Sequence, residues 1–150
     1  GLELAEPLDM PLVITVAKFD AWKHMVKGEL PDFLVTSRGD ENQPKCFDLN
    51  AVEGISKQMR NLLVNLCPAI VTAAERMSNT VCYIPTSSTG CGPFVDGHTA
   101  DGNPIFKHRA GSIQPVWAEV PMLWILSQLT TNLIPILHSR KMSHPQTEQT

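Results

Sequence analysis

The clearest periodic pattern in the chain lies between residues 50 and 66, where apolar residues recur at spacings of three and four. They are Val52, Ile55, Met59, Leu62, Leu63 and Leu66. This spacing is typical of a helix with one face in the core. Asn50, followed by Glu53 three residues later, is predicted to cap this helix. Pro68 suits the first turn of a second helix, predicted over residues 68–77.

Segments rich in β-branched residues predict strands near residues 11–18, 32–37 and 80–84. A short helix over 19–27 would join the first two strands into a β-α-β unit. Two further strands, near 104–109 and 112–117, are expected to form a hairpin around Ala110 and Gly111. The resulting expectation is an α+β fold in which one small mixed sheet packs against the helices.

A last helix is predicted near residues 119–141, with Pro121 in its first turn and a bend at Pro135. Its apolar residues occupy more than one face, which indicates either a central core helix or a helix shared with a second subunit. We therefore expect a homo-oligomer. The predicted interface residues are Trp117, Met122, Trp124, Ile125, Leu126, Leu129 and Leu133.

The length of 150 residues corresponds to one domain, spanning 1–150. The polar ends, 1–10 and 143–150, are expected to fray. Residues 85–104 contain four glycines and three prolines and are predicted to be one long loop. A loop of this length is uncommon in a compact domain and is usually functional or mobile.

Composition and charge exclude several classes of protein. Apolar residues make up 43% and charged residues 18%, which argues against disorder. The net charge of −3 is spread without a block of like charge, so no nucleic-acid tail is indicated. The longest apolar stretch, 120–137, is interrupted by polar residues and falls short of the ~20 residues of a membrane span. No membrane partner is expected.

The four cysteines, Cys46, Cys67, Cys82 and Cys91, are predicted to be unpaired. A domain of this size with a good supply of apolar residues does not need disulfides, and two of the cysteines lie in apolar segments. This interpretation places the protein inside the cell, in a reducing compartment such as the cytoplasm or a virion.

Cys91 lies between Gly90 and Gly92 in the long loop. Flanking glycines let a substrate approach a nucleophile closely. The stretch resembles, over about four residues, the Gly-x-Cys-Gly segment of chymotrypsin-like viral cysteine proteases. The resemblance implies a nucleophilic role for Cys91. A catalytic Cys91 would need an imidazole within hydrogen-bond reach, from His98, His108 or His24, and Asp96 or Asp101 could orient that imidazole. The alternative is an ordinary connecting loop, and we expect the polar side chains of this loop to point apart.

Metal and nucleic-acid sites are two further candidates. Cys91, Asp96, His98, Asp101 and His108 are all possible zinc ligands, but they lack the paired spacing of zinc motifs. No metal and no cofactor are therefore expected. A basic patch that contacts RNA is a further hypothesis. Its residues are Lys57, Arg60, Lys107, Arg109, Arg140 and Lys141.

The sequence contains no nucleotide-binding loop, no paired metal motif and no complete catalytic triad. We therefore expect a non-enzymatic structural, assembly or partner-binding domain, and composition suggests a viral or phage structural or replication-associated component. The alternative is a hydrolase that uses the 85–109 segment, with Cys91 as nucleophile and a histidine base, or with a Cys/His/Asp metal site.

Overall fold

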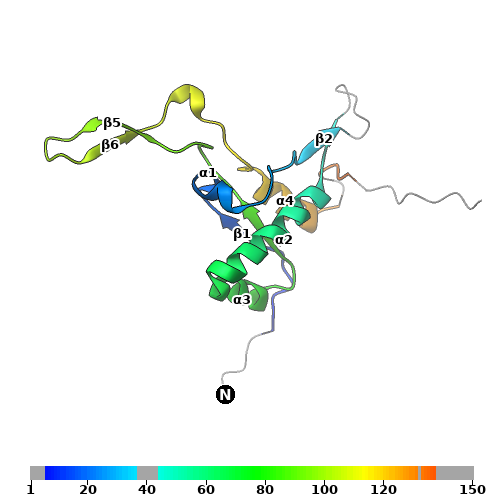
Figure 1. Ribbon diagram of the computed structural model, residues 1–150. Helices are drawn as coiled ribbons and strands as arrows, with labels where there is room; N and C mark the ends of the chain where they lie inside the picture. Colours follow the sequence, from blue (N-terminus) through cyan, green and yellow to red (C-terminus); the bar gives the residue numbers. More distant parts are fainter. Residues whose placement is uncertain (1–5, 37–43, 132, 138–150) are drawn as a thin grey trace, which may run out of the picture.

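The structure, a computed structural model, describes residues 6–36, 44–131 and 133–137 (Figure 1). The first elements along the chain are β1 (Leu12–Val16), the single-turn helix α1 (Phe19–Trp22), η1 (Lys23–Met25), β2 (Leu34–Thr36) and β3 (Lys45–Phe47). They are followed by α2 (Leu49–Leu66), α3 (Pro68–Met77), β4 (Val81–Pro85), β5 (Phe94–His98), β6 (Pro104–Lys107), η2 (Ala110–Ser112) and α4 (Val120–Leu129). The predicted α+β class is confirmed.

Within these residues the strands form three two-stranded sheets, β1–β4, β2–β3 and β5–β6, instead of one mixed sheet. The β1–β4 pair is parallel, with Leu12 opposite Val81 and Val16 opposite Pro85. A parallel pair needs a long crossover, and α2 and α3 provide it. The expected β-α-β unit over 11–37 is wrong, because β2 pairs with β3 in an antiparallel sheet and not with β1.

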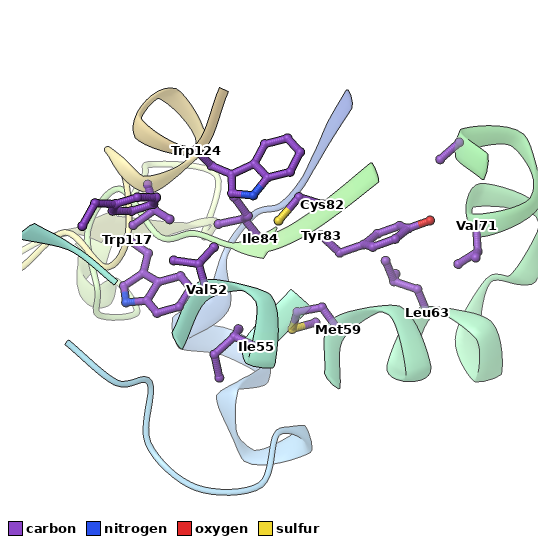
Figure 2. Packing of buried hydrophobic residues seen from close by; sticks show 13 residues of the cluster. Val52, Ile55, Met59, Leu63, Val71, Cys82, Tyr83, Ile84, Trp117 and Trp124 are labelled. Carbon is purple, nitrogen blue, oxygen red and sulfur yellow. The ribbon is translucent and has the colours of Figure 1, made fainter. Parts of the chain in front are cut away.

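The core lies where α2, β4 and α4 meet (Figure 2). Helix α2 packs against β4, while α4 packs against β1. The most deeply buried side chains of the core include Phe47, Val52, Met59, Tyr83 and Ile84. Trp117 and Trp124 complete this core from the C-terminal side.

Helix α2 confirms the predicted periodic face, but its cap is different from the expected one. The helix begins at Leu49, and the Asp48 carboxylate accepts a hydrogen bond of 3.0 Å from the N–H of Ala51. Asp48, and not Asn50, is the N-cap residue. Helix α3 begins and ends where the sequence predicts it, with Pro68 in its first turn.

The region after β4 departs most from the prediction. The expected hairpin of 104–109 with 112–117 is wrong, because β6 pairs with β5, inside the segment predicted to be a loop. Residues 112–117 form no strand: they start in η2, and Val116 makes an isolated bridge to Ser87. The β5–β6 hairpin projects from the body as an arm (Figure 1).

Helix α4 ends at Leu129, well before residue 141. The backbone of Thr130 is already extended. Its N–H and its hydroxyl both donate to the carbonyl of Leu126 and so close the last turn of the helix. Beyond the helix, the chain returns to β3, where the N–H of Phe47 donates to the carbonyl of Pro135. The final part of the predicted helix, 138–141, and the tail 143–150 lie outside the described residues.

Candidate functional site

Parallel pairing brings the carboxyl ends of β1 and β4 to the same edge of their sheet. Ligands of α/β proteins bind at this edge. Here the chain leaves β1 through Ala17 and Lys18 and leaves β4 through residues 86–89. A pocket of about 430 Å³ opens between them, and we call it the carboxyl-edge pocket. It is lined by Ala17, Lys18, Asp20, Thr86, Ser87, Ser88, Thr89, Cys91, Pro93 and His108.

Ser87 connects the chain segments around this pocket through hydrogen bonds. Its side chain is buried, and its hydroxyl donates to the Asp20 carboxylate at 2.5 Å and accepts from the N–H of Gly90 at 2.9 Å. Its backbone also exchanges two hydrogen bonds with Val116. One residue therefore ties the end of β4 to α1, to the glycine turn and to the segment after η2.

Gly90 makes the turn that leads to Cys91. It has a φ of 66°, a left-handed conformation that favours glycine. A β-carbon added to it would lie 1.8 Å from the carbonyl oxygen of Gln114. The turn therefore requires glycine at position 90 both for its backbone conformation and for the close approach of a neighbouring chain segment.

Cys91 lies next to His108 at the mouth of the carboxyl-edge pocket. Its sulfur is 3.8 Å from Nδ1 of His108 and 3.6 Å from the hydroxyl of Ser112. Cys91 is half-buried, whereas His108 and Ser112 are exposed. The expectation that the loop's polar side chains point apart is wrong for this pair.

The other predicted partners of Cys91 lie elsewhere. His98 ends β5, opposite Pro104, and the carboxylate of Asp96 forms an ion pair with Lys107. The alternative catalytic set of Cys91, Asp96 and His98 is therefore not brought together. Among the described residues no carboxylate contacts His108, and no three His, Cys, Asp or Glu side chains gather as metal ligands.

The candidate nucleic-acid residues are spread over separate elements. Arg60 on α2 forms a two-pronged contact with Glu75 on α3, at 2.5 and 2.9 Å. The Arg60 guanidinium lowers the pKa of the Glu75 carboxyl below its ordinary value. Lys107 is paired with Asp96, and Arg109 stacks over the ring of Phe94 at 5.0 Å. Lys57 lies on α2 one turn before Arg60, and Arg140 and Lys141 lie outside the described residues.

Five of the seven predicted interface residues lie on α4, Trp117 precedes the helix and Leu133 follows it, and the structure divides them by exposure. Trp117 and Trp124 are buried in the chain's own core. Met122 is 65% exposed, Leu129 58% and Leu133 62%. Met122, Ile125, Leu126 and Leu129 share one face of the helix by spacing, and Leu133 follows it. We call these five residues the α4 surface.

Sequence reasoning did not include Lys18, Asp20, Ser87 and Ser112 in the site. Each is a common surface residue type, so residue identity alone gave no reason to select it. The available signal was positional, because polar residues directly after two strands gather at one sheet edge if those strands are parallel neighbours. That pairing was not predicted.

No family model matches the chain, and no curated protein and no solved structure matches it either. The chain is an α+β domain with a pocket at the carboxyl edge of a parallel strand pair and an exposed apolar helix face. No helix in the described part of the chain has the length and apolar character needed to cross a membrane.

Proposed function

We propose that the chain is a structural, assembly or partner-binding domain that self-associates through the α4 surface. The observation that carries this proposal is the exposure of Met122, Leu129 and Leu133, each more than half accessible. Met122 and Leu129 share one face of α4 by spacing, and exposed large apolar side chains next to a core are typical of protein–protein interaction sites. Fully burying a side chain of this size is worth roughly 1.5–3 kcal/mol, and burial of the exposed part of each one offsets some of the entropy lost on association.

A second copy of the chain is the proposed partner. Most soluble oligomers are symmetric homo-oligomers, and in a twofold dimer the same patch meets itself. No charged residue occurs within α4, whose sequence is VPMLWILSQL, so two copies of its exposed face can approach without burying a charge.

The setting we propose is a reducing compartment, as a viral or phage structural or replication-associated component. The support comes from composition and from the four cysteines, which are unpaired in the structure. Contact with RNA has less support, because Arg60, Lys107 and Arg109 are each already engaged by a side chain of the same molecule.

Sedimentation velocity across a dilution series tests self-association. Met122→Glu and Leu129→Glu place a carboxylate on the α4 surface, and each should shift the protein to monomer with its circular dichroism unchanged. Gln128→Glu is the matched control, since it adds the same charge at an exposed polar position of the same helix. Leu126→Asp, at a half-buried position, should dissociate or unfold the protein. A wild-type chain that stays monomeric at all concentrations would overturn the proposal.

A hydrolase at the carboxyl-edge pocket is the second candidate function. The observation that favours it is the contact of Cys91 with His108, since a thiol beside an imidazole is the minimal unit of nucleophilic catalysis by cysteine. This candidate is independent of self-association, because the α4 surface and the pocket share no residue.

A further inference from the structure

We propose that Cys91 attacks acyl groups of activated esters and thioesters, with His108 as its general base. This inference rests on the hydrolase candidate, and it assigns that candidate a general base and a substrate class. Sequence alone left His24, His98 and His108 open as bases. The structure brings His108 to Cys91, with 3.8 Å between Sγ and Nδ1.

The surroundings of Cys91 favour an accessible thiol with a fixed position. The Thr89 hydroxyl donates to the backbone carbonyl of Cys91 at 3.0 Å, and the Ser112 oxygen lies 3.6 Å from the sulfur. Because the Ser112 hydroxyl donates its own proton to the carbonyl of Arg109, its oxygen is free to accept from the thiol. These contacts hold Sγ at the rim while the pocket stays open.

The pocket has room for an acyl chain and polar groups to receive it. Its volume of about 430 Å³ is within the range of small-molecule sites, roughly 300–1,000 Å³. Residues 86–89, each a serine or threonine, line it together with Lys18 and Asp20. A short acyl group with a polar end fits this lining better than a long hydrocarbon chain.

The absence of an orienting carboxylate restricts the substrate class. In serine hydrolases, loss of the aspartate that orients the histidine lowers turnover by about 10⁴-fold. Among the described residues, the imidazole of His108 has a hydrogen-bond contact with Cys91 alone. A base held so loosely serves substrates with good leaving groups, which are activated esters and thioesters and not peptides.

The reaction is a two-step acyl transfer without oxidation or reduction. The Cys91 thiol gives its proton to Nδ1 of His108 as the Sγ–C bond forms and the bond from the carbonyl carbon to the leaving oxygen or sulfur breaks. His108 then gives the proton to the leaving group. Water attacks the acyl–Cys91 thioester with His108 as base, which releases the acid and restores the thiol.

The test uses p-nitrophenyl acetate and the intact chain. A burst of p-nitrophenolate is expected, with one acetyl group on Cys91 by peptide mass spectrometry. His108→Gln should slow acetylation of Cys91 by about 100-fold, the usual contribution of a general base. His98→Gln is the matched control and should leave the rate unchanged.

Cys46 and Cys67 serve as internal controls, because both are half-buried thiols that have no imidazole contact in the described structure. Cys91→Ser and Cys91→Ala, each checked by circular dichroism, should abolish the burst. Equal acetylation of Cys46, Cys67 and Cys91, or a rate that His108→Gln does not change, would overturn the inference. If the burst and the acetylation of Cys91 occur but His108→Gln does not slow them, Cys91 is a reactive thiol and His108 is not its base. Absence of any acetylation of Cys91 would refute the hydrolase candidate itself.

Discussion

At the scale of single residues, two non-glycine positions in the described part of the chain adopt left-handed backbone conformations, Lys18 with a φ of 57° and Trp117 with a φ of 50°. Such a conformation costs an ordinary residue roughly 1–2 kcal/mol. Trp117 offsets this through burial, an indole hydrogen bond to the carbonyl of Pro31 and an edge contact with Phe33. Lys18 lies at the carboxyl-edge pocket, and strain of this kind clusters at functional sites.

Gly90 gives a residue-scale prediction. Gly90→Ala should lower the free energy of unfolding by at least about 1–2 kcal/mol, because alanine is strained at this φ and its methyl group meets the Gln114 carbonyl. Gly92→Ala is the control, since nothing lies within 4 Å of a β-carbon there. Urea denaturation of both variants measures the difference. Equal stabilities would show that the turn is rebuilt at little cost.

Cys82 gives a prediction about pH. Burial raises the pKa of its thiol to about 11, against about 8.5 for a free cysteine. The folded state keeps the proton over a range where the unfolded chain has lost it. Stability from this group is therefore complete below about pH 8.5 and is lost as the pH rises to about 11, by about 3 kcal/mol in total.

Cys82→Val isolates this effect, because valine fills a similar volume and does not ionise. Between pH 8 and pH 11 the unfolding free energy of the wild type should fall more steeply than that of the variant. Tyrosine and lysine titrate in both proteins, so the difference between the two slopes reports Cys82. Parallel slopes would show that the thiol has no raised pKa.

At the scale of elements, the sequence predicted what local periodicity determines. Helices α2 and α3 and strands β1, β4 and β6 lie where apolar spacing and β-branched residues place them. Strands β3 and β5 were not predicted, because Lys45–Phe47 has three residues and Phe94–His98 includes Asp96 and Gly97. Their strand character comes from pairing with β2 and β6, which are contacts between segments and leave little trace in local composition.

The candidate site was likewise predictable only in part, where it depends on local sequence. Glycines on both sides drew attention to Cys91 from the sequence alone. The choice of His108 over His98 depends on how the β5–β6 arm folds back, which the sequence pattern did not show. Helix α4 was predicted too long because apolar residues continue through Ile136, while the chain turns at Thr130 to reach β3.

The cap of α2 gives an element-scale prediction. Asp48→Ala should destabilise the protein by about 1 kcal/mol, the usual loss for an N-cap residue, because the N–H of Ala51 loses its acceptor. Asp48→Asn should retain most of the stability, since asparagine caps about as well. Thermal unfolding of the two variants measures this difference in stability. If Asp48→Ala is as stable as the wild type, Asp48 is not the N-cap.

At the scale of the whole molecule, the chain has a packed body and an exposed arm. All four residues of β6 and four of the five in β5 are exposed, and Phe106 is 60% accessible. An isolated two-stranded hairpin is at best marginally stable in water. The body, in contrast, has its core between α2, β4 and α4.

This division predicts the pattern of amide hydrogen exchange. The N–H groups that pair β5 with β6 should exchange at least about 100-fold faster than those that pair β1 with β4, because the arm can open without disturbing the core. The comparison is made by mass spectrometry at a protein concentration where the chain is monomeric. Equal protection of arm and body would mean that the arm is held by contacts the single chain does not show.

The parallel pairing of β1 with β4 also has a consequence for how the chain acquires its fold. Leu12 pairs with Val81, so the numbers of the paired residues differ by 69. Bringing two strands together across so long a loop costs conformational entropy before any contact between them forms. Helices α2 and α3 are adjacent in the chain and form from local contacts. The helical hairpin should therefore come first and present its apolar face to β4. Strand β1, synthesised before all of these, must wait for them, and it stays exposed to other chains until β4 has left the ribosome.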